Sequence, residues 1–237
     1  MPPNASQRLM IALDVPSVDD AKRLVLQLDG VVSFYKVGLE LYTASGPDLV
    51  NWLVSRDTRV FLDIKLLDIE RTVRRAAAQA AGLGVSFLTV HEAGKAVASA
   101  VDGACGSDLK VLAVTVLTSW DAGDLKDAGI HLSVEDLVLR RARKALGGGA
   151  HGVIASGQEA ASLRKLLGND FLIVTPGIRP AGASTDEQKR VMTPAEAIRA
   201  GSDYLVVGRP ITQAPNPKDA ALHIVEEMQK AFDALQT

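Results

Sequence analysis

Residues 60–72 read Val-Phe-Leu-Asp-Ile-Lys-Leu-Leu-Asp-Ile-Glu-Arg-Thr. The apolar start of this stretch predicts a buried strand, and apolar residues at three- and four-residue steps beyond it predict a helix. Asp63 and Lys65 then lie at the end of the strand. Because they are two residues apart, they project to the same side, roughly 7 Å apart along the strand. Asp68 follows where the helix begins, so that three charges fall within six residues.

Two interpretations of this charged cluster remain open at this point. A compact group of acids and a base is the kind of place where pKa values are tuned for chemistry. Alternatively, Asp68 caps the helix, because an acidic side chain suits a helix N-terminus. In that case Asp63 and Lys65 form a structural ion pair. The cluster alone does not choose between a catalytic and a structural role.

The alternation of strand and helix continues along the whole chain. Eight strand–helix units in 237 residues predict a (β/α)8 TIM barrel, with residues 1–237 as a single domain and a doubly wound open sheet as the alternative. No Gly-x-Gly-x-x-Gly follows the first apolar run, so the dinucleotide-binding form of the open sheet is not supported. The predicted strands are Leu9–Val15, Ser33–Val37, Val60–Ile64, Phe87–His91, Val111–Leu117, Gly152–Ala155, Phe171–Val174 and Tyr204–Val207.

The composition argues against several classes of protein. A net charge of −2 gives no sign of a nucleic-acid binder. The single cysteine, Cys105, excludes an intramolecular disulfide and gives no metal-site spacing. The first residues contain no apolar signal core, and no apolar run approaches the roughly 20 residues that span a bilayer. We therefore expect a cytoplasmic protein with neither a nucleic acid nor a membrane as its partner.

Polar side chains fall at the ends of most predicted strands. In a TIM barrel, function gathers at the C-terminal ends of the strands, so these residues would converge on one mouth. Convergence on this scale favours a binding site over solvated surface. His91 remains open between a general acid and a packed, hydrogen-bonded residue. The strand-end residues are Asp14, Lys36, Asp63, Lys65, His91, Glu92, Thr118, Ser119, Arg179, Gly208 and Arg209.

The last two strand ends fit a phosphate site. TIM barrels often bind phosphate with the loops after strands 7 and 8, and this chain has Gly177-Ile178-Arg179 and Gly208-Arg209 there. Glycine lets the backbone approach an anion, and arginine adds a fork of donors. The alternative is that both arginines pair with surface acids. The long polar stretch Pro180–Met192 predicts a lid, and Gln188 and Lys189 would reach the ligand when it closes.

Taken together, these motifs resemble the orotidine 5′-phosphate decarboxylase family of the bacterial type, and the resemblance covers nearly the whole chain. The combination is specific, whereas the Asp-x-Lys-x-x-Asp core alone is not. The matching segments are Asp63-x-Lys65-x-x-Asp68-Ile69-x-x-Thr72, Ala-Leu-Asp14-Val, Tyr-Lys36-Val-Gly, Val-Thr-Val-Leu-Thr118-Ser, Pro-Gly-Ile-Arg179-Pro, Gln188 and Gly208-Arg209.

The resemblance implies an activity and a set of roles. The family decarboxylates orotidine 5′-phosphate to uridine 5′-phosphate without a cofactor or a metal, in de novo pyrimidine synthesis. The resemblance also implies a Lys-Asp-Lys-Asp array made of Lys36, Asp63, Lys65 and Asp68. In this array Lys65 protonates carbon 6 of the pyrimidine as carbon dioxide leaves. The resemblance also implies a homodimer with shared sites. Asp68, Ile69 and Thr72 of one subunit are then expected to reach into the site of the other subunit.

The same resemblance assigns the other predicted residues to parts of the substrate. Asp14 and Lys36 contact the ribose, and Thr118 meets the pyrimidine edge. Four residues are expected to hold the phosphate group or to order the lid, namely Arg179, Gln188, Gly208 and Arg209.

The chain departs from the family pattern at two places. The family often has an aromatic residue and a histidine before the second aspartate, where this chain has Leu66-Leu67. It also often has Pro-Asn before the threonine, where this chain has Glu70-Arg71. Leu67 cannot form a hydrogen bond, so any supporting role of that histidine is missing. The four charged positions and Thr72 are intact, and we interpret the departures as a subgroup difference.

Two rival functions use the same barrel. Phosphosugar decarboxylases of the 3-keto-gulonate phosphate kind share Asp-x-Lys-x-x-Asp but use a magnesium ion. A magnesium site would need a carboxylate at the position of Lys36, whose positive charge would repel the ion. The second rival is a non-catalytic sensor of a phosphorylated ligand, against which the intact Lys65 and Asp68 argue.

Overall fold

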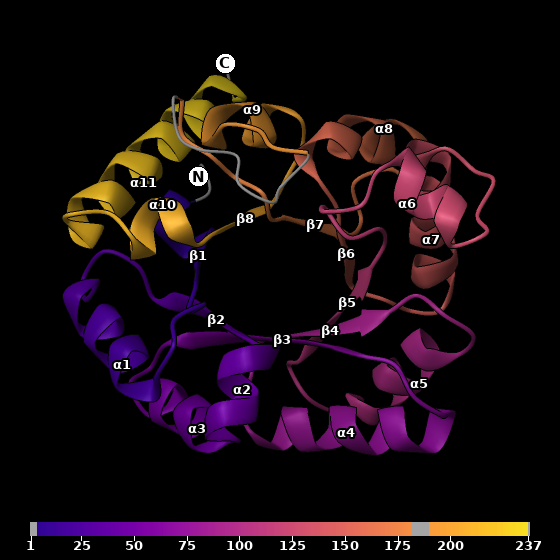
Figure 1. Ribbon diagram of the computed structural model, residues 1–237, viewed down its shortest axis with the longest axis horizontal. Coiled ribbons are helices and arrows are strands. Elements are labelled where there is room, and N and C mark those ends of the chain that lie inside the picture. The colour runs from indigo at the N-terminus through magenta and orange to yellow at the C-terminus, as the bar shows by residue number, and fades with distance from the viewer. Residues whose placement is uncertain (1–3, 182–189, 237) are drawn as a thin grey trace.

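The computed structural model of the protein describes residues 4–181 and 190–236 (Figure 1). Eight parallel strands pair in chain order, and β8 pairs with β1, so the sheet is a closed barrel. This confirms the predicted TIM barrel and excludes the open sheet. The strands are β1 (Leu9–Ala12), β2 (Phe34–Gly38), β3 (Arg59–Leu66), β4 (Phe87–His91), β5 (Lys110–Val114), β6 (Gly152–Ile154), β7 (Leu172–Thr175) and β8 (Tyr204–Val207).

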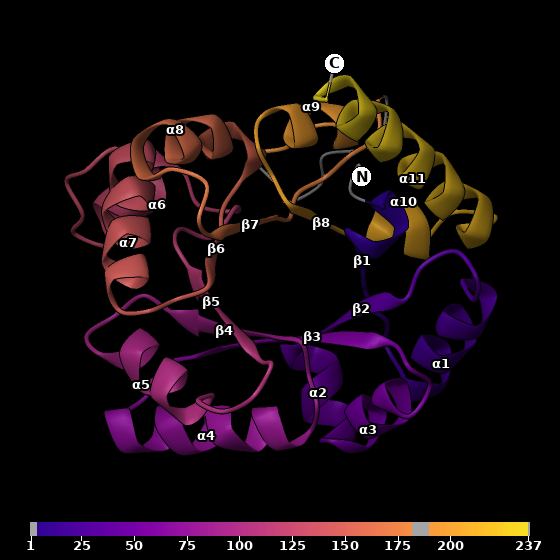
Figure 2. The same cartoon turned by 180° about the vertical axis from the view of Figure 1, so that it is seen from behind.

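Helices form a ring around the barrel, as Figures 1 and 2 show from its two ends. Within the described ranges, three connections carry a helix beyond the one per strand, namely those after β2, β5 and β8. The helices are η1 (Ala5–Gln7), α1 (Val18–Gln27), α2 (Leu39–Ser45), α3 (Asp48–Val54), α4 (Glu70–Gly82), α5 (Ala96–Gly103), α6 (Ala122–Asp127), α7 (Val134–Gly147), α8 (Gly157–Leu167), α9 (Pro194–Arg199), α10 (Arg209–Thr212) and α11 (Pro217–Ala234). No helix in the described part of the chain is both long and apolar enough to cross a membrane.

Two apolar layers hold the barrel together. The larger layer lies between the strands and the surrounding helices, because successive strand residues point to opposite faces. The smaller layer fills the barrel interior, and aromatic rings close its N-terminal end: Phe34, Phe87 and Tyr204 meet edge to face at 5.2–5.9 Å between ring centroids. The Arg59 guanidinium lies 4.1 Å from the Phe34 ring centroid. The interior is therefore packed at one end, and the polar mouth lies at the other.

Strand β3 is longer and less regular than the sequence predicts. The predicted strand ended at Ile64, whereas β3 continues to Leu66, so Lys65 as well as Asp63 lies within the strand. Its pairing with β4 steps from Leu62 to Leu66 while β4 advances by only two residues, which marks a β-bulge. Lys65 has a φ of +48°, in the left-handed region that a side chain other than glycine rarely occupies. The bulge therefore bends the strand at its two charged residues.

The start of α4 also differs from the prediction. The helix begins at Glu70, with Ile69 at its N-cap and no side-chain cap. The Asp68 carboxylate accepts a hydrogen bond from the Ile69 N–H at 2.6 Å, so the interpretation of Asp68 as the helix cap is wrong. Ile69 is 72% exposed, because it precedes the first helical turn.

Candidate active site

A cavity of about 540 Å³ opens at the C-terminal end of the barrel. Eight of the predicted site residues line it: Asp14, Lys36, Asp63, Lys65, Thr118, Arg179, Gly208 and Arg209. Asp68, Ile69 and Thr72 do not line it and are exposed in the β3–α4 connection and the first turn of α4. Gln188 and Lys189 lie outside the described residues. A single chain therefore brings together most of the predicted site and leaves three of its members on the surface.

Four charged side chains of alternating sign form a row along one wall of the cavity, which we call the charged row. Lys36 Nζ lies 3.0 Å from Asp14 Oδ1 and 3.6 Å from Asp63 Oδ2. Lys65 Nζ lies 2.8 Å from Asp63 Oδ1. The two middle side chains are the buried ones, with 10% of Lys36 and 13% of Asp63 exposed, against 59% of Asp14 and 36% of Lys65. Lys65 thus offers an ammonium group to the cavity while Asp63 holds it from behind.

Asp63 is ionised despite its burial. Burial alone would raise the pKa of its carboxyl group, but the Lys36 and Lys65 ammonium groups lower it. Hydrogen bonds from Lys65 and Thr89 lower it further, so that the pKa of Asp63 lies below its ordinary value. The carboxylate is therefore a fixed negative charge between two lysines at any pH near neutrality.

Gly38 makes room for the outer part of the charged row. A Cβ atom added there would lie 3.1 Å from both Asp14 Oδ1 and Lys36 Nζ, closer than most real Cβ contacts. The glycine that ends β2 in the Tyr-Lys-Val-Gly segment therefore lets these two charged groups meet.

Thr89 on β4 also contacts the charged row, and the sequence analysis missed it. Its side chain is fully buried. Its hydroxyl accepts a hydrogen bond from the Lys65 N–H at 3.0 Å and donates one to Asp63 Oδ1 at 2.9 Å. A signal was present in the sequence: a hydroxyl residue two positions after Phe87 in a strand lies on the interior face with it. It was overlooked because threonine is also a common strand residue.

Another part of the cavity lining comes from the segments after β7 and β8. Gly177 has a φ of +75°, which glycine adopts without a steric penalty, and it leads into the buried Arg179. The Arg179 guanidinium donates to its neighbour's carbonyl, that of Ile178, at 2.9 Å. Gly208 precedes α10, whose first residue is Arg209. Two guanidinium groups and two glycines therefore line the cavity at the strand ends where TIM barrels often bind phosphate.

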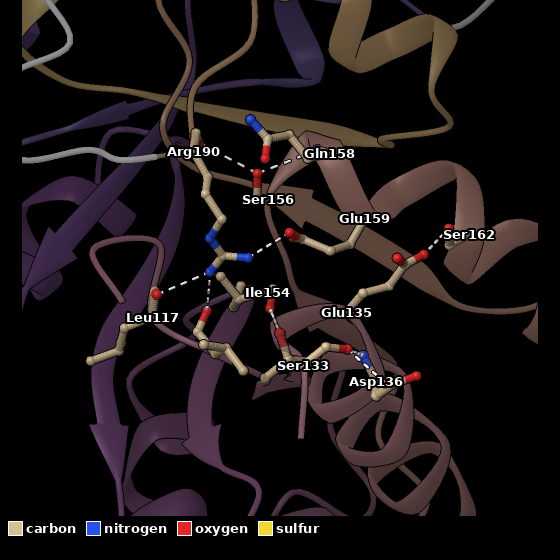
Figure 3. A network of polar contacts seen from close by, with 12 residues as sticks. Leu117, Ser133, Glu135, Asp136, Ile154, Ser156, Gln158, Glu159, Ser162 and Arg190 are labelled. Atoms are coloured by element: carbon tan, nitrogen blue, oxygen red, sulfur yellow. Dashed lines mark hydrogen bonds and ion pairs between the residues drawn. The ribbon is translucent and has the colours of Figure 1, made fainter. Parts of the chain in front are cut away.

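Arg190, a second residue that the sequence analysis missed, links its own segment after β7 to helix α8 and to the loop after β5 (Figure 3). Its guanidinium donates to Glu159 at 2.5 Å and to the carbonyls of Leu117 at 3.0 Å and Val116 at 3.3 Å. Burial raises the pKa of Glu159, and Arg190 counters that shift only in part. Val116 and Leu117 line the cavity next to Thr118, so Arg190 braces the loop after β5.

The polar residues at the end of β4 do not line the cavity. His91 is half-buried, and burial lowers its pKa, as do the nearby charges of Lys65 and Arg141. Its imidazole is therefore neutral near pH 7. Glu92 pairs with Lys144 at 2.8 Å and turns toward α7. The packed, hydrogen-bonded role of His91 stays a prediction.

Across residues 4–181 and 190–236, no three His, Cys, Asp or Glu side chains are grouped so that they could hold a metal ion. The two acids nearest to each other in the cavity, Asp14 and Asp63, have the Lys36 ammonium between them. A cation already occupies the place where their oxygens converge.

Comparison with known proteins gives consistent matches over nearly the full length. Residues 7–224 match the orotidine 5′-phosphate decarboxylase / HUMPS family. The chain is 54% identical over 228 residues to an orotidine 5′-phosphate decarboxylase of Nitrobacter winogradskyi, covering 96% of this chain and 95% of the relative. It is 51% identical over 230 residues to one of Afipia carboxidovorans, covering 97% and 98%.

Solved structures agree with these matches. The crystal structure of an orotidine 5′-phosphate decarboxylase from Lactobacillus acidophilus is similar, with a TM-score of 0.83 and 38% identity over 94% of this chain and 99% of that chain. A conserved protein of Geobacillus kaustophilus, of uncharacterised function, gives a TM-score of 0.81 and 33% identity over 93% and 99%.

Proposed function

Because the chain belongs to the orotidine 5′-phosphate decarboxylase / HUMPS family, we propose that it converts orotidine 5′-phosphate to uridine 5′-phosphate and carbon dioxide in pyrimidine synthesis. The curated relatives that are 51–54% identical carry this activity in their names. The observation that carries the proposal is the charged row, which presents the Lys65 ammonium to a cavity large enough for a nucleotide.

The chemistry requires what this row supplies. When the bond between carbon 6 and the carboxylate breaks, the electron pair stays on carbon 6 and carbon dioxide leaves. The pyrimidine offers no electron sink for that pair, so the protein must stabilise the developing negative charge. The Lys65 ammonium attracts this charge and then transfers a proton to carbon 6, which completes the product. Lys65 becomes neutral in this step and regains a proton from water.

Asp63 has two parts in this proposal. It directs the Lys65 ammonium, through the contact at 2.8 Å. Its negative charge also faces the site that the substrate carboxylate would occupy, and this repulsion is relieved when carbon dioxide departs. Because the row is assembled before the substrate binds, no reorganisation is needed as charge develops.

The remaining cavity residues fit the other parts of the nucleotide. Asp14 and Lys36, at the outer end of the charged row, would bind the ribose hydroxyls. Thr118, which is buried beside Val116 and Leu117, would bind the pyrimidine edge. Arg179, Gly208 and Arg209 would hold the phosphate, together with Gln188. Binding energy from the phosphate, remote from the reacting carbon, can then order the site around the pyrimidine.

We further propose that the active protein is a homodimer with shared sites. The Lys-Asp-Lys-Asp array is incomplete in one subunit, since Asp68 does not line the cavity of its own barrel. Leu67 and Ile69 on either side of it are 57% and 72% exposed, and a partner subunit would cover these two apolar side chains. Asp68, Ile69 and Thr72 of one subunit would complete the other subunit's site.

The proposal includes no metal and no organic cofactor, and it takes the chain as one domain acting in the cytoplasm. The ammonium of Lys36 between Asp14 and Asp63 supports the first of these points, because it would repel a divalent cation. The same observation speaks against the phosphosugar rival, which needs magnesium.

The direct test is to mix the protein with orotidine 5′-phosphate and follow its ultraviolet absorbance. We expect the absorbance to fall as uridine 5′-phosphate and carbon dioxide form in equal amounts. The Lys65→Ala protein, prepared in the same way, controls for contaminating activity. A wild-type rate no greater than that of the variant would refute the proposed function.

A further inference from the structure

The backbone at Lys65 is held in a conformation that it would not adopt by itself. Its φ of +48° lies in the left-handed region, at the bulge where β3 gains two residues on β4. Such outliers persist only where the surrounding structure enforces them, and they cluster at functional sites. Something must therefore keep the Lys65 backbone in place.

The Thr89 hydroxyl contacts both residues that the bulge displaces. A hydroxyl has one donor and two acceptor positions, and here it accepts from the Lys65 N–H at 3.0 Å and donates to Asp63 Oδ1 at 2.9 Å. That same Asp63 oxygen accepts from Lys65 Nζ at 2.8 Å. One buried side chain on β4 thus fixes the main chain of the lysine and the carboxylate that directs its ammonium.

We propose that Thr89 is a positioning residue, which holds Asp63 and the Lys65 backbone so that the Lys65 ammonium faces the reacting carbon. This inference deepens the proposed decarboxylation and rests on it. Thr89 does not line the cavity, so it acts through its two partners and not on the substrate.

The test uses the hydroxyl alone. Thr89→Val keeps the shape of the side chain and removes both hydrogen bonds. Thr89→Ala removes the hydrogen bonds together with the γ-methyl group, and Thr89→Ser keeps the hydrogen bonds. Thr175→Val is the matched control, because Thr175 is also a fully buried strand threonine, whose hydroxyl lies 2.7 Å from that of Ser202.

We expect Thr89→Val and Thr89→Ala to lower kcat for orotidine 5′-phosphate at least tenfold, with the affinity for uridine 5′-phosphate changed less than threefold. Thr89→Ser should stay within threefold of wild type, and Thr175→Val within twofold. The proposal is overturned if either hydroxyl-free variant that folds retains kcat within twofold. It is also overturned if Thr175→Val loses as much activity as Thr89→Val.

A second measurement does not depend on activity. Carbon-13 NMR of the side-chain carboxyl follows the titration of Asp63 in each protein. Loss of the Thr89 donor should raise the pKa of Asp63 in Thr89→Val, while Thr89→Ser and Thr175→Val leave it unchanged. An unchanged Asp63 titration in Thr89→Val would contradict the positioning role. A wild-type protein that fails to decarboxylate orotidine 5′-phosphate would instead refute the proposed function, and the titration would still test Thr89.

Discussion

Replacing Asp63 with asparagine removes the central negative charge of the charged row and keeps its shape. At an effective dielectric constant of 20, the attraction of Asp63 to Lys65 at 2.8 Å is about 6 kcal/mol and that to Lys36 at 3.6 Å about 5 kcal/mol. Desolvation of the buried groups offsets much of this attraction. We therefore expect the free energy of unfolding to fall by about 3 kcal/mol at pH 7, which is typical when one partner of a buried ion pair is removed.

The same substitution should lower the rate far more than the binding. The Lys65 ammonium loses the carboxylate that directs it, and the two lysines of the row then repel each other. We expect kcat to fall at least a hundredfold, equivalent to about 2.7 kcal/mol in the barrier. The assay is steady-state decarboxylation of orotidine 5′-phosphate, with the dissociation constant of uridine 5′-phosphate measured separately. A kcat within tenfold of wild type in a folded Asp63→Asn protein would refute the reasoning.

The pH dependence of stability gives an independent check on Asp63. The pKa of Asp63 is lower in the folded protein than in the unfolded chain, where the pKa of an aspartate is about 3.9. Its contribution is therefore complete above that value and is lost as the pH falls through the lower folded value. In urea unfolding, the difference between wild type and Asp63→Asn should be constant from pH 7 to pH 5 and shrink below pH 4. A difference that is already gone at pH 5 would contradict the lowered pKa.

Three further substitutions test the other roles. The kcat of Lys65→Ala should fall far more than tenfold, where tenfold corresponds to about 1.4 kcal/mol in the barrier, while folding and product affinity persist. A fall of less than tenfold would mean that another group donates the proton. Mixing inactive Lys65→Ala and Asp68→Ala proteins under conditions of subunit exchange should restore roughly a quarter of wild-type activity, since half of the dimers hold one intact site of two. No recovery despite proven exchange would refute the shared site. Arg209→Ala should lose roughly 3 kcal/mol in kcat/KM on orotidine 5′-phosphate and almost nothing on orotidine, because a charge-assisted contact to the phosphate is lost. An equal loss on both substrates would show that Arg209 supports only the barrel mouth.

The sequence predicted the barrel because each buried strand leaves a short apolar run, but it misplaced several strand ends. The predicted first and fifth strands ran to Val15 and Leu117, whereas β1 ends at Ala12 and β5 at Val114. Leu13 and Val116 beyond those ends are nevertheless buried, at 0% and 3% exposure. Apolar residues that pack at the barrel mouth resemble strand residues in sequence although they lie outside the strands.

The sequence predicted the charged residues of the candidate site and missed the residues that act through packing and hydrogen bonds. Asp14, Lys36, Asp63 and Lys65 stand out against apolar surroundings, and the barrel brings all four to one cavity. The bulge in β3 left no sequence signal, since nothing in Asp-Ile-Lys requires the left-handed backbone of Lys65. Thr89 and Arg190 act through contacts with residues far away in the sequence, and only the closed barrel reveals such contacts.

The central claim is that this chain decarboxylates orotidine 5′-phosphate with its own lysines and aspartates and without a metal. The most direct measurement is the initial rate of the protein after exhaustive chelation, compared with the rate of the same sample after magnesium is added back. The account predicts two equal rates, both abolished by Lys65→Ala. A rate that vanishes on chelation and returns with magnesium would contradict it, because the Lys36 ammonium between Asp14 and Asp63 leaves no room for a catalytic cation there.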